Sequence, residues 1–293
     1  MPAPTETSLP SDLLTLESRD GARIRVSLYG GHLCSWCGID GTERLFVSRR
    51  TRWDRSSALR GGVPIIFPQF ADFGTLPKHG FARIANWTLD HSECAADGAG
   101  VLRLTLRDGA ASRAFAGNFL LALTLKFSDR RLEMALSVTN TGQRAFEFCA
   151  ALHTYLRAEI ARSSVGGFNG QTYRDSANQG RTVVAQVDAA TAGTLPIDRE
   201  IDRIYQGLRK RVTLHTPEHM IDITQSGFDD VVLWNPWREK AAAIADLDKD
   251  DYLRFVCIEA ALVNHPATLQ AGESWLGTQM LEVRACGSIA ATD

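Results

Sequence analysis

The feature that most constrains the fold is a strict alternation of apolar and polar side chains in the middle of the chain. Residues 119–127 place Phe, Leu, Leu, Leu and Phe on one parity. A polar turn over 128–131 follows, and residues 132–139 alternate again, with Leu, Met, Leu and Val on one face and Glu, Ser and Thr on the other. Period-two alternation is typical of half-buried strands, so the two runs predict an antiparallel hairpin.

Similar strand patterns extend through the chain, whereas helical patterns are scarce. A third strand is expected over 144–156, after an Asn-Thr-Gly turn. Glu239, Lys240 and a run of alanines indicate one short helix over 238–247. Many short strands with few helices predict an all-β sandwich or barrel. The other expected strands cover 24–28, 101–106, 212–214, 221–224, 254–263 and 280–283.

The length of 293 residues allows two ordinary domains or one large all-β domain. No repeat, low-complexity tract or linker divides the sequence, so we predict a single domain over 13–286. The remaining residues are expected to form a disordered N-terminal tail, 1–12, and a C-terminal tail, 287–293.

Charge and end-group patterns exclude several classes of partner. With 32 basic and 34 acidic residues the formal net charge is −2, which supplies no general attraction for nucleic acid. The N-terminus lacks the basic and apolar regions of a signal peptide, and no apolar run is long enough for a membrane helix. We therefore expect a cytoplasmic protein, a monomer, with no nucleic-acid or membrane partner. The six cysteines are expected to be reduced, and the pair Cys34 and Cys37 is interpreted as part of a strand and its turn rather than a redox or zinc site.

The segment 58–89 is rich in Gly and Pro yet also apolar and aromatic, which is unusual for either a strand or a linker. Such a composition favours a rigid loop that presents polar groups to a ligand. A structural crossover with incidental surface charges is the alternative. The polar side chains available in this segment are Arg60, Gln69, Lys78, His79 and Arg83.

His153 lies on the less apolar face of the expected strand 144–156, so its imidazole should face water or a cleft. A lone strand histidine is usually structural, and parity alone does not make it catalytic. Glu259 interrupts the apolar run RFVCIEAALV, with no basic residue nearer than Arg254. A buried, unpaired carboxylate there would have a raised pKa, as a general base needs. An outward-facing carboxylate at an exposed strand position is the equally weighted alternative.

Other chemistry-bearing patterns are weaker. The charges of PIDREIDRIY, which include Asp202, are most simply a solvated loop. The sequence contains no Rossmann glycine motif, P-loop, GxSxG elbow or HExxH zinc motif.

Seven segments in order resemble the hexose-6-phosphate mutarotase (glucose-6-phosphate 1-epimerase) branch of the aldose 1-epimerase family. The most specific string is RGGVPIIFPQF followed by HGFAR. The others are GGHLCSWCGIDGTERLFVS, ALHTYL, IDRIY, DDVVLWNPW and FVCIEAALV, together with LPKHGFARIANW around the second motif. The resemblance implies a galactose-mutarotase-like β-sandwich, a supersandwich of antiparallel sheets with the sugar site on a concave face.

By matching position, the resemblance implies a role for each candidate residue. His153 would be the general acid and Glu259 the general base. The other assignments are His79 and Asp202 to sugar hydroxyls, Arg60 and Arg83 to phosphate, and Gln69 to the pocket lining. No cofactor or metal is implied, because anomer exchange involves only proton transfer and ring opening. Lys78, where a neutral residue is expected, and Ala260-Ala261, where relatives often carry Pro and Gly, depart from the family pattern.

Three rival functions remain at this stage. The substrate of a free-aldose epimerase is neutral, so it would not explain why two guanidinium groups are placed to bind the same ligand. A non-catalytic sugar-phosphate sensor would not need both His153 and Glu259. A glycosidase would need a second buried carboxylate of similar quality, and the sequence offers none as clear.

Overall fold

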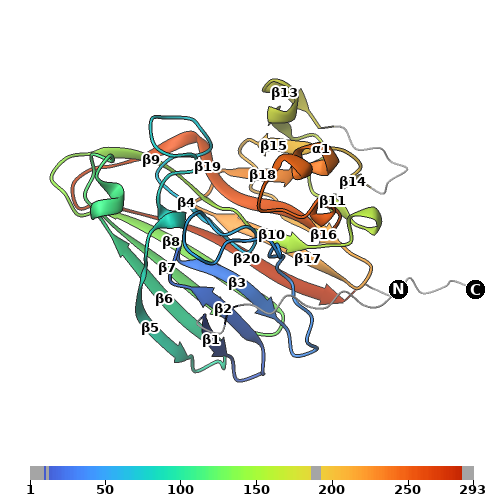
Figure 1. The fold of residues 1–293 in the computed structure, drawn as a ribbon, viewed down its shortest axis with the longest axis horizontal. Coiled ribbons are helices and arrows are strands. Elements are labelled where there is room, and N and C mark those ends of the chain that lie inside the picture. The colour runs from blue at the N-terminus through green and yellow to red at the C-terminus, as the bar shows by residue number, and fades with distance from the viewer. Residues whose placement is uncertain (1–9, 11–12, 186–192, 286–293) are drawn as a thin grey trace, which may run out of the picture.

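The structure is a computed structural model that describes residue 10 and residues 13–185 and 193–285. It consists mainly of antiparallel strands in three sheets, two of which are large and face each other (Figure 1). This is the β-sandwich class that the alternating patterns predicted. Apart from Pro10, the expected tails over 1–12 and 287–293 lie outside the described residues.

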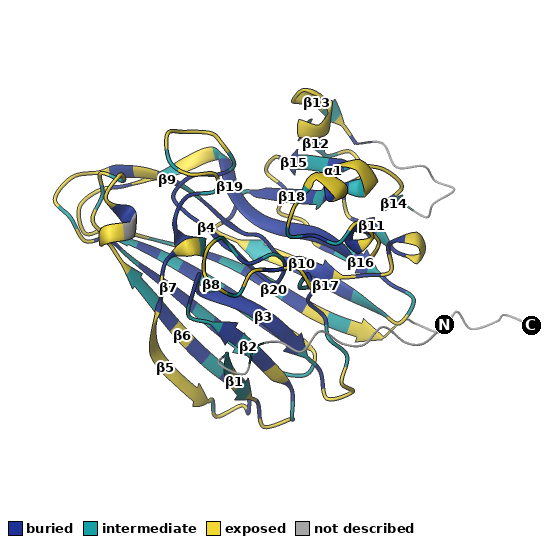
Figure 2. Ribbon diagram, in the orientation of Figure 1, coloured by how far each residue is buried: buried dark blue, intermediate teal, exposed yellow. Residues whose placement is uncertain are grey.

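The largest sheet has nine strands and contains the predicted hairpin. Strands β7 and β8 pair with Leu123 opposite Leu136, as the alternation required. The edge strand β5 is exposed along its whole length (Figure 2). In spatial order the strands are β14 (Thr194–Pro196), β11 (Ser164–Gly166), β16 (Val212–His215), β17 (His219–Ser226), β20 (Ser274–Ala285), β8 (Arg131–Asn140), β7 (Phe119–Phe127), β6 (Gly100–Arg107) and β5 (Thr88–Cys94).

The second sheet has eight strands and carries the candidate site. Its order is β13 (Arg181–Val184), β12 (Thr172–Asp175), β15 (Ile201–Tyr205), β18 (Asp230–Asn235), β19 (Phe255–Leu269), β9 (Phe146–Leu152) and β4 (Ile65–Ile66), with β10 (Tyr155–Arg157) also paired to β19. A three-stranded sheet comprises β1 (Leu14–Glu17), β2 (Arg23–Ser27) and β3 (His32–Cys37). Cys34 and Cys37 both lie in β3 as free thiols, as expected.

Helices are few and short, as the sequence indicated. The α-helix α1 spans Trp237–Ala243, so the predicted helix over 238–247 ends early. Ile244 adopts an extended backbone, and the turn that follows buries Leu247 against aromatic residues of the site's sheet. No helix among the described residues is long and apolar enough to cross a membrane. The described 3-10 turns are η1 (Ala82–Ile84), η2 (Ala110–Ser112), η3 (Ile160–Arg162), η4 (Ser176–Asn178) and η6 (Asp251–Leu253).

Two predicted strands of the site's sheet differ from their expected bounds. The strand over 144–156 is divided into β9 and β10 by a break at His153 and Thr154. The Thr154 amide donates to the Leu152 carbonyl, which takes it out of the ladder. The strand over 254–263 continues to Leu269 after a register shift between Leu262 and Ala267.

Alternation in β9 and β19 decides which side chains reach the core. Phe148, Leu152, Ile258 and Ala260 belong to the main buried cluster, and Phe148 contacts Trp275 of the facing sheet. This cluster takes members from all three sheets, and Figure 2 shows buried residues concentrated along their central strands. The opposite parity of the same strands therefore faces away from the core.

One buried polar network joins the two large sheets beneath the strand break. Thr154 donates to the side chain of Gln279 (2.6 Å), which donates in turn to the Ile258 carbonyl (2.9 Å). Both polar side chains are fully buried. A buried polar group that loses its hydrogen-bond partner lowers the stability of the fold. This network therefore holds the break between β9 and β10 in one position relative to the facing sheet.

We predict that Gln279→Leu lowers the free energy of unfolding by about 1 to 3 kcal/mol, because it removes the buried hydrogen bonds that Gln279 makes with the Thr154 hydroxyl and the Ile258 carbonyl. Urea denaturation provides the measurement. The control is Thr139→Val, which removes a hydroxyl pair with Ser274 at an exposed position of β8 and β20. Equal small effects in both variants would contradict the role assigned to the buried network.

Candidate active site

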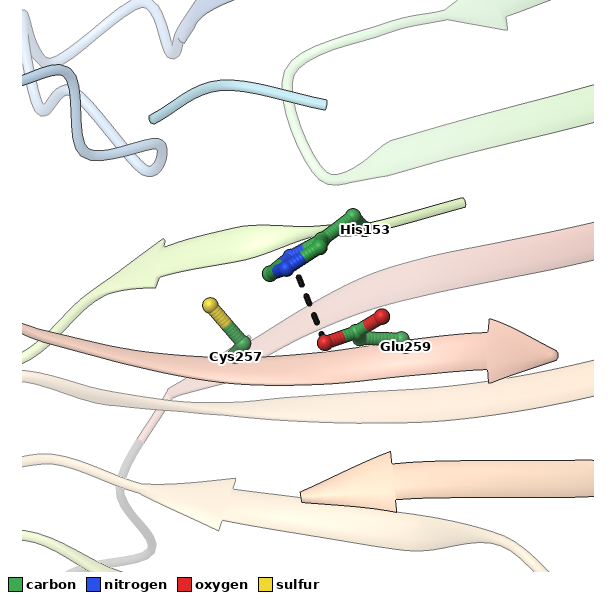
Figure 3. A group of neighbouring side chains, drawn as sticks. All are labelled: His153, Cys257 and Glu259. Carbon is green, nitrogen blue, oxygen red and sulfur yellow. Dashed lines mark ion pairs between the residues drawn. The ribbon is translucent and has the colours of Figure 1, made fainter. Parts of the chain in front are cut away.

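The candidate site is a cavity of about 670 Å³ on the face of the eight-stranded sheet that points away from the core. His153 and Glu259 lie at its floor, with 3.3 Å between His153 Nδ1 and Glu259 Oε1. Both side chains are buried, and Figure 3 shows the imidazole above the carboxyl group. The alternative of an exposed Glu259 is therefore excluded. The lining comprises Arg60, Phe70, Ala71, Phe73, Lys78, His79, Arg83, His153, Arg174, Ser176, Gly180, Asp202, Val232, Trp234, Lys240, Ile244 and Glu259.

Strand register explains why these two side chains meet. Leu152 of β9 pairs with Ala260, and Tyr155 of β10 pairs with Cys257. The same register continued through the break places His153 directly opposite Glu259. Side chains at opposed positions of neighbouring strands lie close on one face, which is here the cavity face.

Burial shifts the two pKa values in opposite directions. The pKa of Glu259 is raised well above its usual value by burial and by the nearby Asp202 carboxylate. The pKa of His153 is lowered by burial, then by His79, and then by the charges of Arg60 and Arg83. His153 Nδ1 and Glu259 Oε2 are buried without a hydrogen bond, and the 3.3 Å contact joins Nδ1 to the other carboxyl oxygen, Oε1. Both groups are thus open to a ligand in the cavity.

Aromatic side chains hold the imidazole of His153 in place. Tyr155 stacks on it with ring centroids 4.8 Å apart, and Trp234 meets it edge-on at 5.7 Å. His79 approaches from a third side at 5.8 Å. The ring therefore has little freedom to turn away from Glu259.

The loop over 58–89 positions His79 through a strained backbone. His79 has a φ of 63°, and a side chain on the following Gly80 would collide with the Phe67 carbonyl. The Ala71 amide donates to His79 Nδ1 (3.2 Å), so the ring proton is on Nε2. Burial and the charges of Arg83 and Lys78 lower the pKa of His79 to about 2. His79 is consequently a neutral side chain at the cavity wall that can donate a hydrogen bond.

Gln69 does not line the cavity, contrary to the expectation from the resemblance. Its side-chain amide donates to the carbonyls of Ala71 and Leu76, both at 3.1 Å, and its oxygen accepts from the Leu76 amide (2.9 Å). Gln69 is only 5% exposed, and its hydrogen bonds stabilise the loop that carries His79. Its contribution to the site is therefore structural.

Two arginines at the cavity wall have different surroundings. Arg60 donates to Asp246 (3.0 Å) and to the Tyr155 hydroxyl (3.1 Å), and although burial opposes its charge, these neighbours raise its pKa. Arg83 donates to the Lys78 carbonyl (2.7 Å), and its Nε is buried without a partner. Burial and the nearby Arg60 lower the Arg83 pKa to about 10. In the described part of the chain no carboxylate lies within ion-pair distance of Arg83, which leaves its charge available for an anion.

Asp202 also lines the cavity, where it accepts from Lys240 of α1 at 3.3 Å. Burial raises the Asp202 pKa, although the Lys240 charge opposes the shift. Glu200 shares the same lysine at 2.9 Å. The segment PIDREIDRIY, which was expected to be a solvated loop, thus supplies the two carboxylates of an ion-pair network with Lys240 at the cavity wall.

The cavity concentrates positive charge in a protein whose formal net charge is −2. Five cationic side chains line it, against two acidic ones, Asp202 and Glu259. The cations are Arg60, Lys78, Arg83, Arg174 and Lys240. Of the two departures from the family pattern, Lys78 lines the cavity, whereas Ala260 and Ala261 are buried in β19.

Several lining residues were not identified as site residues from the sequence. Trp234 lies within DDVVLWNPW, a segment used only for the resemblance, and its alternation with Val232 could have marked the same face. Lys240 was read only as a helix-forming residue. Arg174 packs over the Phe73 ring at 4.6 Å, a pairing that joins β12 to the loop and has no local sequence signal.

Comparison with known proteins agrees with this geometry. The sequence profile of the family described as "Aldose 1-epimerase" matches residues 12–282. The chain belongs to the aldose 1-epimerase family. The match covers every residue of the candidate site and all but the last three residues of the described sheets.

Relatives within this family support the same assignment. The chain is 32% identical over 271 residues to a protein from Cenchrus ciliaris named "Putative glucose-6-phosphate 1-epimerase", covering 88% of this chain and 81% of that protein. A protein of the same name from Salmonella typhimurium is 31% identical, with 87% and 85% covered. A crystal structure described as a "putative mutarotase (YeaD)" from Salmonella typhimurium superposes with a TM-score of 0.84 at 26% identity, covering 94% of this chain and 90% of that one.

We predict that Glu259→Gln stabilises the protein, increasingly so as the pH rises. The folded-state pKa of Glu259 is raised, so its protonated form favours folding and stability is lost as the pH climbs through and above the unfolded pKa. Glutamine removes this loss. Urea unfolding at about pH 5 and about pH 8 should show a larger gain at the higher pH.

The matched control for this prediction is Glu282→Gln, an exposed glutamate on β20. It should not reproduce the pH-dependent gain. A Glu259→Gln variant whose stability relative to the wild type did not change with pH would contradict the uncompensated burial of this carboxyl group.

Proposed function

We propose that this protein is a glucose-6-phosphate 1-epimerase, which interconverts the α and β anomers of hexose 6-phosphates without a cofactor. The observation that carries the proposal is the pair of His153 and Glu259 at the floor of the cavity, below two arginines. Of these, Arg83 has no carboxylate within ion-pair distance in the described part of the chain. The names of the Cenchrus and Salmonella relatives support the same substrate class.

Two proton transfers account for the reaction. In the reactive state of the pair, with Glu259 ionised and His153 protonated, Glu259 takes the proton of the C1 hydroxyl while His153 gives a proton to the ring oxygen, and the C1–O5 bond breaks to leave an open-chain aldehyde. Rotation about the C1–C2 bond presents the other carbonyl face. The C5 hydroxyl then attacks that face, and the two protons return by the reverse route. Each well-placed acid or base contributes about 10²- to 10⁴-fold in rate.

The remaining residues orient the sugar in this proposal. His79 donates from Nε2 to a sugar oxygen, and Asp202, held by Lys240, accepts from a hydroxyl. Arg60 and Arg83 bind the 6-phosphate through charge-assisted hydrogen bonds. Gln69 supports the loop that presents His79.

The rival functions are less well supported. A neutral aldose would leave the Arg83 charge uncompensated beside Arg60, which disfavours the free-sugar reading. A sensor would not need the unsatisfied His153 and Glu259 atoms. Asp202 does place a second carboxylate in the cavity, but its ion pair with Lys240 suits binding better than glycosidase chemistry.

We also propose a cytoplasmic monomer. Exposed large apolar side chains are scattered among separate elements of the described chain and form no extended apolar patch there. They include Ile39, Phe73, Leu89 and Leu276. The described cysteines are free thiols, in keeping with a reducing compartment.

We predict that His153→Asn and Glu259→Gln each lower the anomer exchange rate by about 10²-fold or more, because both keep size and polarity but abolish proton transfer. Exchange is measured by NMR on glucose 6-phosphate, after subtraction of the spontaneous rate. Cooperative unfolding of each variant shows that the fold is intact. Near-normal exchange in either variant would end the assignment of the pair.

We predict that Arg83→Ala lowers kcat/KM for glucose 6-phosphate by about one to two orders of magnitude, through loss of a phosphate contact of about 1.5 to 3 kcal/mol. Arg60→Ala should act in the same direction, with added effects from releasing Asp246 and Tyr155. The reaction of free glucose should change little.

The control for the arginine variants is Arg130→Ala, which removes an exposed guanidinium outside the cavity lining. Measuring both sugars separates a lost phosphate contact from general damage, which would lower both rates together. If Arg60→Ala and Arg83→Ala both kept the wild-type preference for the phosphorylated sugar, the free-aldose reading would replace the present one.

A further inference from the structure

Three side chains that commonly bind metals converge at the cavity floor, where His153 and Glu259 line the cavity and Cys257 lies fully buried beside them. Their ligand atoms, from His153, Cys257 and Glu259, all lie within 4.8 Å of one another. Figure 3 shows the Cys257 sulfur and the Glu259 carboxyl group on β19 with the His153 imidazole beside them. The proposed anomer exchange uses the histidine and the glutamate but gives the cysteine no role.

The sheet itself brings the three groups together. Cys257 and Glu259 are two residues apart on β19, so their side chains leave the same face of the strand. His153 lies opposite Glu259 on the neighbouring chain segment, because the register of β9 and β10 with β19 is continuous. The grouping is therefore held by backbone hydrogen bonds, and no flexible loop contributes a ligand.

Two of the three groups carry buried atoms without a partner. His153 Nδ1 and Glu259 Oε2 lack hydrogen bonds, and their side chains are 8% and 1% exposed. Both residues line the cavity, which gives an ion a route to them. Unsatisfied polar atoms are costly to bury unless a ligand completes them.

We propose that the cavity floor binds a thiophilic divalent cation of the Zn²⁺ class, and that this ion competes with the sugar for His153 and Glu259. The competition rests on the proposed function, whereas the binding does not. The ion would be an inhibitor that occupies the proton-transfer groups, so it is distinct from a cofactor of the reaction.

The ligand set matches the chemistry of zinc. One thiolate, one imidazole nitrogen and one carboxylate form a three-residue set of the kind that leaves a fourth tetrahedral position for water, here on the cavity side. Ligand atoms in such a site are about 3.5 Å apart, so the three groups, which lie within 4.8 Å of one another, would have to draw closer when the ion binds. Sulfur and nitrogen donors select zinc over magnesium or calcium.

Charge and proton balance are satisfied on binding. The thiol loses its proton to solvent, as does the carboxyl group where it is protonated, and neutral His153 supplies a lone pair. The two negative ligands then offset the two positive charges of the ion. The bound complex is neutral, which suits a site beside Arg60 and Arg83 better than a free cation would.

The test is isothermal titration of the full chain with zinc chloride and, separately, magnesium chloride, with a phosphine as reductant. The wild type should bind one zinc ion at this site, and Cys257→Ser should weaken that binding by at least about tenfold. Magnesium should give no comparable binding. Substitution with Co²⁺ should show a thiolate charge-transfer band that disappears in Cys257→Ser.

The matched control is Cys94→Ser, an exposed thiol on β5 close in sequence to His91 and Glu93. It should keep zinc affinity and the cobalt band. Undiminished zinc affinity in Cys257→Ser, or a cobalt band lost only in Cys94→Ser, would overturn the proposal. Absence of zinc binding in the reduced wild type would overturn it as well.

Inhibition is measured separately, with the rate of each variant divided by its own zinc-free rate. Zinc should raise the apparent KM for glucose 6-phosphate in the wild type, and the rise should be smaller in Cys257→Ser. Zinc bound through Cys257 in a protein without anomer exchange would uphold the site and reject the proposed function. Zinc bound there without any effect on exchange would overturn the competition.

Discussion

The site depends on the register between β19 and the chain segment that forms β9 and β10. Backbone hydrogen bonds on both sides of the break at His153 set that register. It holds the imidazole of His153 opposite the carboxyl group of Glu259. Burying these groups disfavours the charged form of each, a cost that the surrounding apolar core must offset. The core does so from below, where the Thr154 and Gln279 network ties the break to the facing sheet. The packing of the two large sheets therefore also determines the geometry of the site.

Much of the fold could be predicted because its pattern is local. The alternation over 119–139 specifies both strands of the hairpin and the face that each buries, and the structure confirms it. The apolar neighbours of Glu259 left burial and exposure equally weighted, and the structure shows that it is buried. Gln69 could not be placed correctly, because its partners are the backbone groups of its own loop, and their positions depend on the tertiary path. The role of Lys240 required the contact between α1 and β15, which joins residues 38 positions apart.

The same unsatisfied atoms serve both proposals for the cavity. A sugar offers hydroxyls and a ring oxygen to His153 and Glu259, whereas a metal ion offers an empty orbital to the same atoms and adds the Cys257 sulfur beside them. The difference lies in what the neighbouring charges tolerate. A phosphate is attracted by Arg60 and Arg83, and a free cation is repelled by them until the anionic ligands neutralise it. In the proposed function, the cavity wall therefore favours the phosphorylated sugar.

The arginine pair has a consequence that goes beyond affinity. Arg60 and Arg83 are among the groups that lower the pKa of His153, and therefore disfavour the protonated imidazole that ring opening needs. In the proposed function, a bound phosphate dianion would offset both guanidinium charges and remove their part of this shift, while the larger part caused by burial would remain. A neutral sugar in the same cavity would leave the part of the shift caused by the arginines in place. The phosphate would then act on the acid as well as on affinity, because a substrate that brings negative charge would favour the protonated imidazole more than a neutral sugar does.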